Sequence, residues 1–426
     1  MKELKQTVKS GAPSTDTLPP LKWLLNLVGR GETLYLLSLF IYVWYEIVKL
    51  SMMTQVLSDA VFNVMRVVSL LLLALSEVAH LRERSKSELR GPVAVIRDTV
   101  INNPAAFIYA VALIGFSAIS FLTSDVFYPV YTALYVVSAR NYQFERIARA
   151  GFYAILSATA ACLILCLLGV IEDYVWVQAD GNRVRHGLGF LYATYTSFFV
   201  LYATLLLLYL HGGRLGIVRT LLVVVIDVAV YLLTDSRTAF ILVLVSLALA
   251  WLTSSEQPVV KKVVAVLLKA SPALFVAIVV LSIVLMVVYD PTNVLLEKIN
   301  DGLGNRLSIS HYTFSQNGIT LFGQFVEMHG QGIMENGARY TAGPVTFIDN
   351  SFCHIAVRQG VAVLVLFVGA ELLLLKKLSE EGRSLEAALL MVIAIHSFID
   401  SWYLMLCMNL FILLIGTELL KPRHCR

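Results

Sequence analysis

The stretch VVAVLLKASPALFVAIVVLSIVLMVV, residues 263–288, decides the fold of this chain. It carries one charged residue, Lys269, and is longer than the roughly 20 residues that a helix needs to cross a bilayer. An apolar run of this length predicts a transmembrane helix. Similar runs recur along nearly the whole chain, so we expect most of the protein to lie in a membrane.

The composition of the 426 residues leads to the same class of protein. Hydrophobic residues make up 58% and charged residues 15%, whereas a soluble domain has about 45–50% and about 25%. Too little polar surface remains to keep such a chain in water. The composition excludes a secreted enzyme and a nucleic-acid-binding protein, and the continuous apolar runs exclude an outer-membrane barrel, whose strands would alternate.

The apolar runs predict an all-α, polytopic transmembrane helix bundle of about twelve spans. The fourth run is short and contains Pro129, and the eleventh is also short. The expected spans are 33–48, 61–81, 104–122, 126–137, 152–171, 188–210, 217–233, 238–252, 263–288, 352–375, 387–398 and 403–420.

The charges predict the orientation, because cytoplasmic loops collect Lys and Arg. With both termini in the cytoplasm, 23 of the 33 Lys and Arg residues lie on that side. Two basic loops, 82–97 and 139–149, require two crossings between them, which is why the short fourth span is kept. The expected parts are a cytoplasmic segment 1–32, the bundle 33–420 with outer loops 172–187 and 289–351, and a cytoplasmic tail 421–426. The second outer loop is large and precedes the last three spans.

The outer segments carry an unusual set of basic residues. Only two are lysines, Lys49 and Lys298. The planar fork of arginine can bind two phosphate oxygens at once and never loses its charge, so the pattern favours an anion site. The arginines are Arg183, Arg185, Arg237, Arg306, Arg339 and Arg358.

Polar residues within the spans allow two interpretations each. Asn350, His354 and Arg358 follow at i, i+4 and i+8 and predict one polar stripe on the tenth span. Such residues often face a water-filled interior, but His354 could equally be a packing histidine and Arg358 could have a structural partner. Arg237 could reach the headgroups or pair with Asp235.

Two further pairs are expected to be structural. Asp227 and Lys269 are interpreted as a buried pair between helices in preference to a proton relay. His396 and Asp400 are one helical turn apart and are also expected to pair. The five cysteines show neither a disulfide framework nor zinc-ligand spacing, and we expect no metal and no cofactor.

Four segments in order carry a resemblance to a known family. The chain resembles the bacterial O-antigen polymerase (Wzy) family and the related O-antigen ligases over roughly residues 150–420. The segments are RVRHGLGF at 183–190, TDSRTAF at 234–240, NRLSISHYTFSQNGITLFG at 305–323 and IDNSFCHIAVRQG at 348–360.

The resemblance implies a membrane-embedded, metal-independent glycosyltransferase. Such enzymes move a glycan from undecaprenyl diphosphate to a sugar hydroxyl at the outer face of the bacterial cytoplasmic membrane. By resemblance, Arg183, Arg185, Arg237 and Arg306 bind the diphosphate, which gains charge as it leaves. The implied partners are the lipid-linked oligosaccharide, a chain-length regulator and a flippase.

The fourth segment supplies the candidate general base. Ligases of this kind carry a His-Asn pair there, whereas this chain has Asp349 and Asn350, which favours a polymerase. Asp349 is therefore the expected base of an inverting displacement, acting with Arg237 and Arg306. His311 competes for this role, and the possible substrate contacts are His311, Asn350, His354 and Arg358.

Two other functions stay open at this point. A ligase would differ only in its acceptor. A lipid-linked sugar flippase or secondary transporter could use Asp227, Arg66 and Lys269 within the spans, although the two halves of the chain show no similarity to each other.

Overall fold

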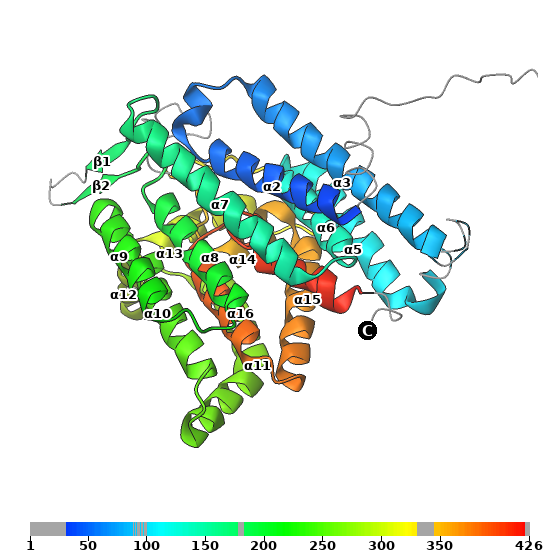
Figure 1. Ribbon diagram of the computed structural model, residues 1–426. Helices are drawn as coiled ribbons and strands as arrows, with labels where there is room; N and C mark the ends of the chain where they lie inside the picture. The colour runs from blue at the N-terminus through cyan, green and yellow to red at the C-terminus, as the bar shows by residue number, and fades with distance from the viewer. Residues whose placement is uncertain are drawn as a thin grey trace, which may run out of the picture.

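A computed structural model describes residues 31–87, 89, 91, 94, 97, 100–177, 183–329 and 345–421 of the protein. These residues form a helical protein (Figure 1). Most of the predicted segments 1–32 and 421–426, and Arg339, lie outside the described residues. The elements are α2 (Gly31–Lys49), η1 (Met52–Gln55), α3 (Asp59–Ser87), α5 (Pro104–Ser124), α6 (Tyr128–Ala139), α7 (Phe144–Leu167), β1 (Val175–Val177), β2 (Val184–His186), α8 (Thr194–Leu210), α9 (Ile217–Thr234), α10 (Arg237–Thr253), α11 (Pro258–Val288), α12 (Val294–Gly302), α13 (Arg306–Asn317), α14 (Ser351–His354), η2 (Ile355–Gln359), α15 (Val361–Glu380), α16 (Ser384–Ser397), η3 (Leu410–Leu413) and η4 (Ile415–Leu419).

Six helices in the described part of the chain are long and apolar enough to cross a membrane, namely α2, α3, α5, α7, α9 and α11. The outward faces of α9 and α11 are apolar, with Leu232 74% and Val280 53% exposed. Large exposed apolar faces of this kind indicate contact with lipid. The all-α class and the membrane character are confirmed, while α6, α8, α10 and α16 are shorter helices at predicted spans.

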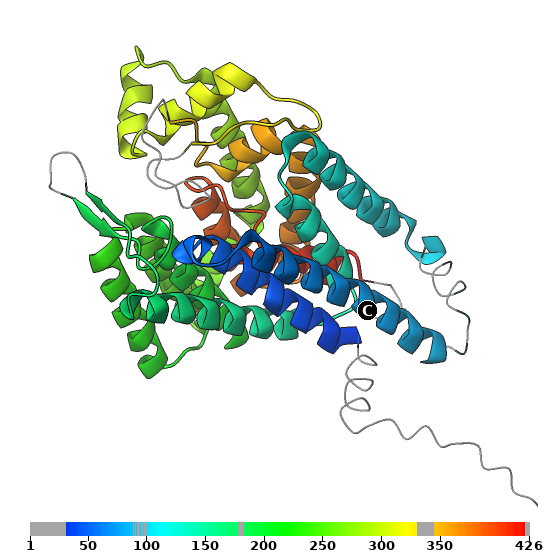
Figure 2. The same ribbon diagram turned by 90° about the horizontal axis from the view of Figure 1, so that it is seen from above.

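Helices α2, α3 and α7 lie side by side (Figures 1 and 2). The α2–α3 contact uses small polar residues, because Ser38 Oγ donates to the carbonyl of Ser69 at 2.7 Å. Between α2 and α7, Trp44 Nε1 donates to Ser157 Oγ at 2.9 Å. Small residues and interhelical hydrogen bonds are the usual means of packing helices in a membrane.

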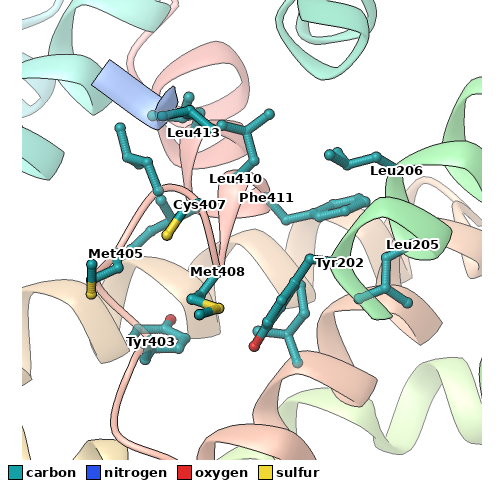
Figure 3. Packing of buried hydrophobic residues seen from close by; sticks show 14 of the residues in the cluster. Tyr202, Leu205, Leu206, Tyr403, Met405, Cys407, Met408, Leu410, Phe411 and Leu413 are labelled. Atoms are coloured by element: carbon teal, nitrogen blue, oxygen red, sulfur yellow. The ribbon is translucent and has the colours of Figure 1, made fainter. Parts of the chain in front are cut away.

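The prediction of one helix over 403–420 is wrong. Residues 398–409 contain no regular helix, and only the short η3 and η4 follow. Figure 3 shows this segment packed against Tyr202, Leu205 and Leu206 of α8. Irregular backbone is tolerated at membrane depth where protein surrounds it, and side chains pair with it here: Cys407 N donates to Glu46 Oε2 at 2.7 Å.

The predicted continuous helix over 352–375 is also wrong, because it is broken into α14, a π-helical turn (η2) and α15. The break is at Gly360, where φ is +95°. Backbone from the loop after α13 fills the break. Val361 N donates to the carbonyl of Thr320 and Ala362 N to that of Leu321, both at 3.0 Å, which supplies acceptors for the first amides of α15.

The loop between α7 and α8 contains a small antiparallel hairpin, β1 and β2, in which Trp176 pairs with Arg185. This hairpin was not predicted. It contacts the end of α9 (Figure 1). Arg185 therefore lies on a short strand, with Arg183 directly before it, next to the α9–α10 turn.

Candidate functional site

Asp235 organises the α9–α10 turn. It ends α9 in the left-handed conformation, with φ at +46°. Its carboxylate accepts hydrogen bonds from Arg183 Nε and, at 3.3 Å, from Arg237 Nε, and its carbonyl accepts one from Arg183 Nη2 at 2.9 Å. Partial burial would raise the pKa of Asp235, but the hydrogen bonds and charges of the two arginines outweigh it, and the pKa lies below its ordinary value.

Arg185 extends from β2 towards the same turn. Its Nε donates to the carbonyl of Thr234 at 2.8 Å. Burial lowers the pKa of Arg185 to about 10, and the positive charges of Arg183 and Arg306 lower it further, against the opposing charge of Asp235. The negative charge of Asp235 therefore does not balance the burial of Arg185 and the positive charges near it. A bound anion would supply that charge.

Arg306 begins α13, and its Nε lies 3.3 Å from Asp349 Oδ2. The alignment is poor for a hydrogen bond, so this buried Nε remains without a hydrogen-bond acceptor. Burial raises the pKa of Asp349, and Arg306 partly opposes this. Asp349 is thus a half-buried carboxylate next to a guanidinium that keeps donor capacity for another ligand.

These contacts bring together side chains from four separate parts of the sequence. After the predicted outer loops, we call them the outer arginine cluster, which consists of Arg183, Arg185, Arg237 and Arg306 with Asp235 and Asp349. Four guanidinium groups face two carboxylates, so positive charge is in excess. The hairpin follows the end of α7, and the turn follows the end of α9. Helix α13 follows α11 and the short α12.

Asn350 and His311 have structural contacts. Asn350 Oδ1 caps α14 by accepting from the amides of Phe352 and Cys353, and its Nδ2 donates to Ser282 Oγ and to the carbonyl of Phe398. His311 Nδ1 donates to the carbonyl of Met286 at 2.8 Å, and its ring packs on Tyr289. These bonds use all four hydrogen-bonding positions of the Asn350 side chain and tie His311 to α11.

The predicted polar stripe is divided between two places. His354 and Arg358 line a cavity of about 160 Å³, whereas Asn350 faces a smaller hollow beside Arg306. His354 Nδ1 lies 3.3 Å from the hydroxyl of Tyr128. Asn350 is the N-cap of α14 and precedes its helical residues, so it does not continue the stripe of His354 and Arg358.

Asp400 is a buried acid that the sequence did not mark as part of the site. It is 7% exposed, and burial, followed by the charge of Asp349, raises its pKa well above the ordinary value. Its carbonyl accepts from Ser351 Oγ at 2.5 Å. The predicted pairing with His396 is replaced, since His396 Nδ1 is hydrogen-bonded to the Tyr202 hydroxyl at 2.9 Å.

The predicted Asp227–Lys269 pair is wrong. Asp227 is 1% exposed and its Oδ2 has no hydrogen-bond partner, while Lys269 is exposed on α11. Across the described residues, no group of three His, Cys, Asp or Glu side chains is placed to hold a metal ion.

The fold and the site define a helical membrane protein with a cationic site at the ends of its helices. Comparison with protein-family models, with curated proteins and with solved structures finds no match for the chain. The geometry of the site and the family-like segments therefore carry the functional argument.

Proposed function

We propose that the protein is a polysaccharide polymerase of the bacterial cytoplasmic membrane. It transfers a glycan from undecaprenyl diphosphate to a sugar hydroxyl of another lipid-linked repeat unit. In this proposal the chain crosses the membrane about twelve times with both termini in the cytoplasm, and the outer arginine cluster faces the opposite side. A flippase that delivers the repeat units and a chain-length regulator are the proposed protein partners.

The excess positive charge of the outer arginine cluster is the observation that carries this proposal. A diphosphate leaving group gains negative charge as the glycosidic bond breaks, and fixed donors stabilise that charge. Arginine forks bind phosphate oxygens in pairs. The lowered pKa of Arg185 supports an anion between Arg185 and Arg306, as does the Arg306 Nε, which has no hydrogen-bond acceptor.

Asp349 is the proposed general base. The acceptor oxygen forms a bond to the anomeric carbon while the bond from that carbon to the diphosphate oxygen breaks, and this electron pair stays on the diphosphate. The acceptor proton passes to the Asp349 carboxylate. Attack opposite to the leaving group inverts the anomeric centre, and the raised pKa of Asp349 makes it a stronger base than an exposed aspartate.

Alanine variants of the cluster test this function in a strain that lacks its own copy of the gene. Arg185→Ala and Arg306→Ala are expected to insert into the membrane and to lose the ladder of long glycan chains on a gel. Arg214→Ala is the control arginine variant: the Arg214 side chain is 70% exposed and contacts Glu256 and the carbonyl of Ser254 at a different loop. Normal ladders in both cluster variants would contradict the proposal.

A ligase-like transfer to another acceptor uses the same chemistry, and Asp349 in the position of a histidine argues against it by resemblance. A flippase or secondary transporter is the candidate of another class. The buried, unpaired Asp227 supports it, because proton paths use such acids within spans.

A further inference from the structure

A second hollow lies apart from the outer arginine cluster, and we call it the aromatic cavity. It is the 160 Å³ cavity that contains His354 and Arg358. The end of α2, the start of α6, η2 and the irregular segment after α16 enclose it. Space of this size holds roughly ten water molecules, which matches a single sugar residue. Its aromatic lining includes Tyr45, Tyr128, Tyr195, Phe347 and Trp402.

Arg358 is the residue that indicates the charge of the ligand. Its Nε is buried and has no hydrogen-bond partner, and no ion pair to its guanidinium is found among the described residues. Burying an unpaired charge is unfavourable, so an anionic ligand would stabilise it. Arg358 lies on the π-helical turn η2, and π-helical turns occur frequently at functional sites.

Lys49 adds a second cation to the wall of the cavity. Its ion pair with Asp59 is 3.6 Å long, and the Asp59 side chain is 90% exposed. Exposed pairs of this kind are weak, so Lys49 can turn to a ligand. The cavity also contains Glu46, whose Oε1 has no hydrogen-bond partner and can accept from a sugar hydroxyl.

The aromatic lining indicates a sugar rather than a simple anion. Ring faces carry partial negative charge, and they attract the C–H groups on the apolar face of a pyranose. An apolar wall with a few converging polar groups is the usual form of a small-molecule site. Aromatic rings, two cations and two acids, Glu46 and Asp125, line the cavity. The cations fit the carboxylate of an acidic sugar, and the acids can accept from its hydroxyls.

Two residues of the cavity lining are close in sequence to the proposed base, Asp349, and to Asp400. Phe347 lies two residues before Asp349, and Trp402 lies two residues after Asp400. The rings of Phe347 and Trp402 are neighbours, with centroids 6.4 Å apart. A glycan that enters the cavity therefore runs along the two segments that carry the carboxylates beside Arg306.

We propose that the aromatic cavity binds the acceptor glycan and selects one that contains a carboxylate sugar. Arg358 and Lys49 bind the carboxylate, and Trp402 stacks on the sugar ring. The role as acceptor site rests on the proposed polymerase function, whereas the class of ligand follows from the cavity itself.

Calorimetric titration of the purified full-length protein in detergent tests this inference. The probes are cellobiouronic acid, a disaccharide with one carboxylate, and its neutral counterpart cellobiose; inorganic phosphate serves as a simple anion. Cellobiouronic acid is expected to bind at least ten-fold more tightly than either. Arg358→Gln should remove this preference, and Lys49→Gln should reduce it, with the melting temperature as a check on folding.

Three results would overturn the inference. The first is that the two disaccharides bind equally or not at all. The second is that Lys49→Gln and a folded Arg358→Gln both keep the wild-type preference for the acid sugar. The third is that phosphate binds as tightly as the acid sugar. Undecaprenyl diphosphate titrated into the same variants separates the two proposals. Arg358→Gln should keep diphosphate binding, and its loss there would place the diphosphate in the aromatic cavity. If the sugar titration fails but the diphosphate still binds and this binding depends on Arg185, only the acceptor site is overturned.

Discussion

Asp349 links the local electrostatics to the proposed chemistry. Burial raises the pKa of Asp349, and the charge of Arg306 partly opposes this. A base acts in its deprotonated form, so the rate of elongation should fall as the pH decreases through this raised pKa. The fall should begin at a higher pH than the ordinary aspartate value of 3.8 would give.

Asp349→Asn removes the base and nearly conserves the volume of the side chain. General base catalysis contributes about 100-fold or more to a rate, so we expect a loss of that size and the disappearance of the acidic limb. The measurement is the pH–rate profile of repeat-unit elongation with purified protein. Wild-type rates in Asp349→Asn would contradict the assignment and leave the reaction without this base.

Asp227 separates polymerisation from transport. The unpaired carboxylate is buried within α9, and burying a polar group without a partner costs about 1–3 kcal/mol. We expect Asp227→Asn to keep full elongation activity and to melt at the same or a higher temperature. Thermal unfolding and the glycan ladder measure both effects. Abolished function in a well-folded Asp227→Asn protein would favour the transporter.

The sequence predicted some of the site residues and missed others for identifiable reasons. Arginines on the predicted outer side are conspicuous because basic residues normally collect inside. The aromatic cavity could not be predicted, since Lys49, Tyr128 and Trp402 have no common spacing and meet only in the folded bundle. Asp400 was missed because its neighbour Asp349 is far away in the sequence.

At the scale of single elements, the break before α15 depends on two glycines that face each other. Gly360 has φ at +95° and Gly323 at +90°. A Cβ on Gly360 would lie 2.3 Å from the amide nitrogen of Gly323, and one on Gly323 would lie 2.7 Å from the carbonyl oxygen of Arg358. Backbone on both sides leaves no room for either methyl group.

Gly360→Ala should therefore separate the loop after α13, which contains Gly323, from η2 and α15. A non-glycine residue in this conformation, with φ +95° and ψ +157°, costs about 1–3 kcal/mol. The clash adds to this cost, so we expect a clearly lower melting temperature. Gly369→Ala in α15 is the control, because a Cβ there meets nothing within 4 Å, and alanine favours a helix by up to about 1 kcal/mol. Equal melting temperatures of the two variants would show that the loop does not depend on this contact.

Hydropathy predicted the long helices, both the buried α2 and the lipid-facing α9 and α11, and failed for the irregular segment after α16. α2, α9 and α11 were placed closely because long apolar runs determine them. The run 402–408 is also apolar, but its side chains are buried against α8 and the rest of the core. An apolar run can be buried by lipid or by protein, and only the second allows an irregular backbone.

At the scale of the whole molecule, the bundle brings loops that are far apart in sequence to one cationic site. The hairpin after α7, the turn after α9 and α13 after α11 contribute arginines. Each of these three helices is long and apolar enough to cross a membrane, so a site beyond their ends would lie at the membrane surface. That position suits a lipid whose diphosphate is at the headgroup level and whose tail remains in the bilayer.

Binding of undecaprenyl diphosphate to the purified protein, with EDTA present, tests the central claim most directly. We expect the wild-type protein and Arg214→Ala to bind it with equal affinity and to prefer it to undecaprenyl monophosphate, because arginine forks bind paired oxygens. Arg185→Ala and Arg306→Ala should each weaken binding by at least ten-fold, which corresponds to about 1.4 kcal/mol. Wild-type affinity in both cluster variants, or binding that EDTA abolishes, would contradict a metal-independent diphosphate site built from arginines.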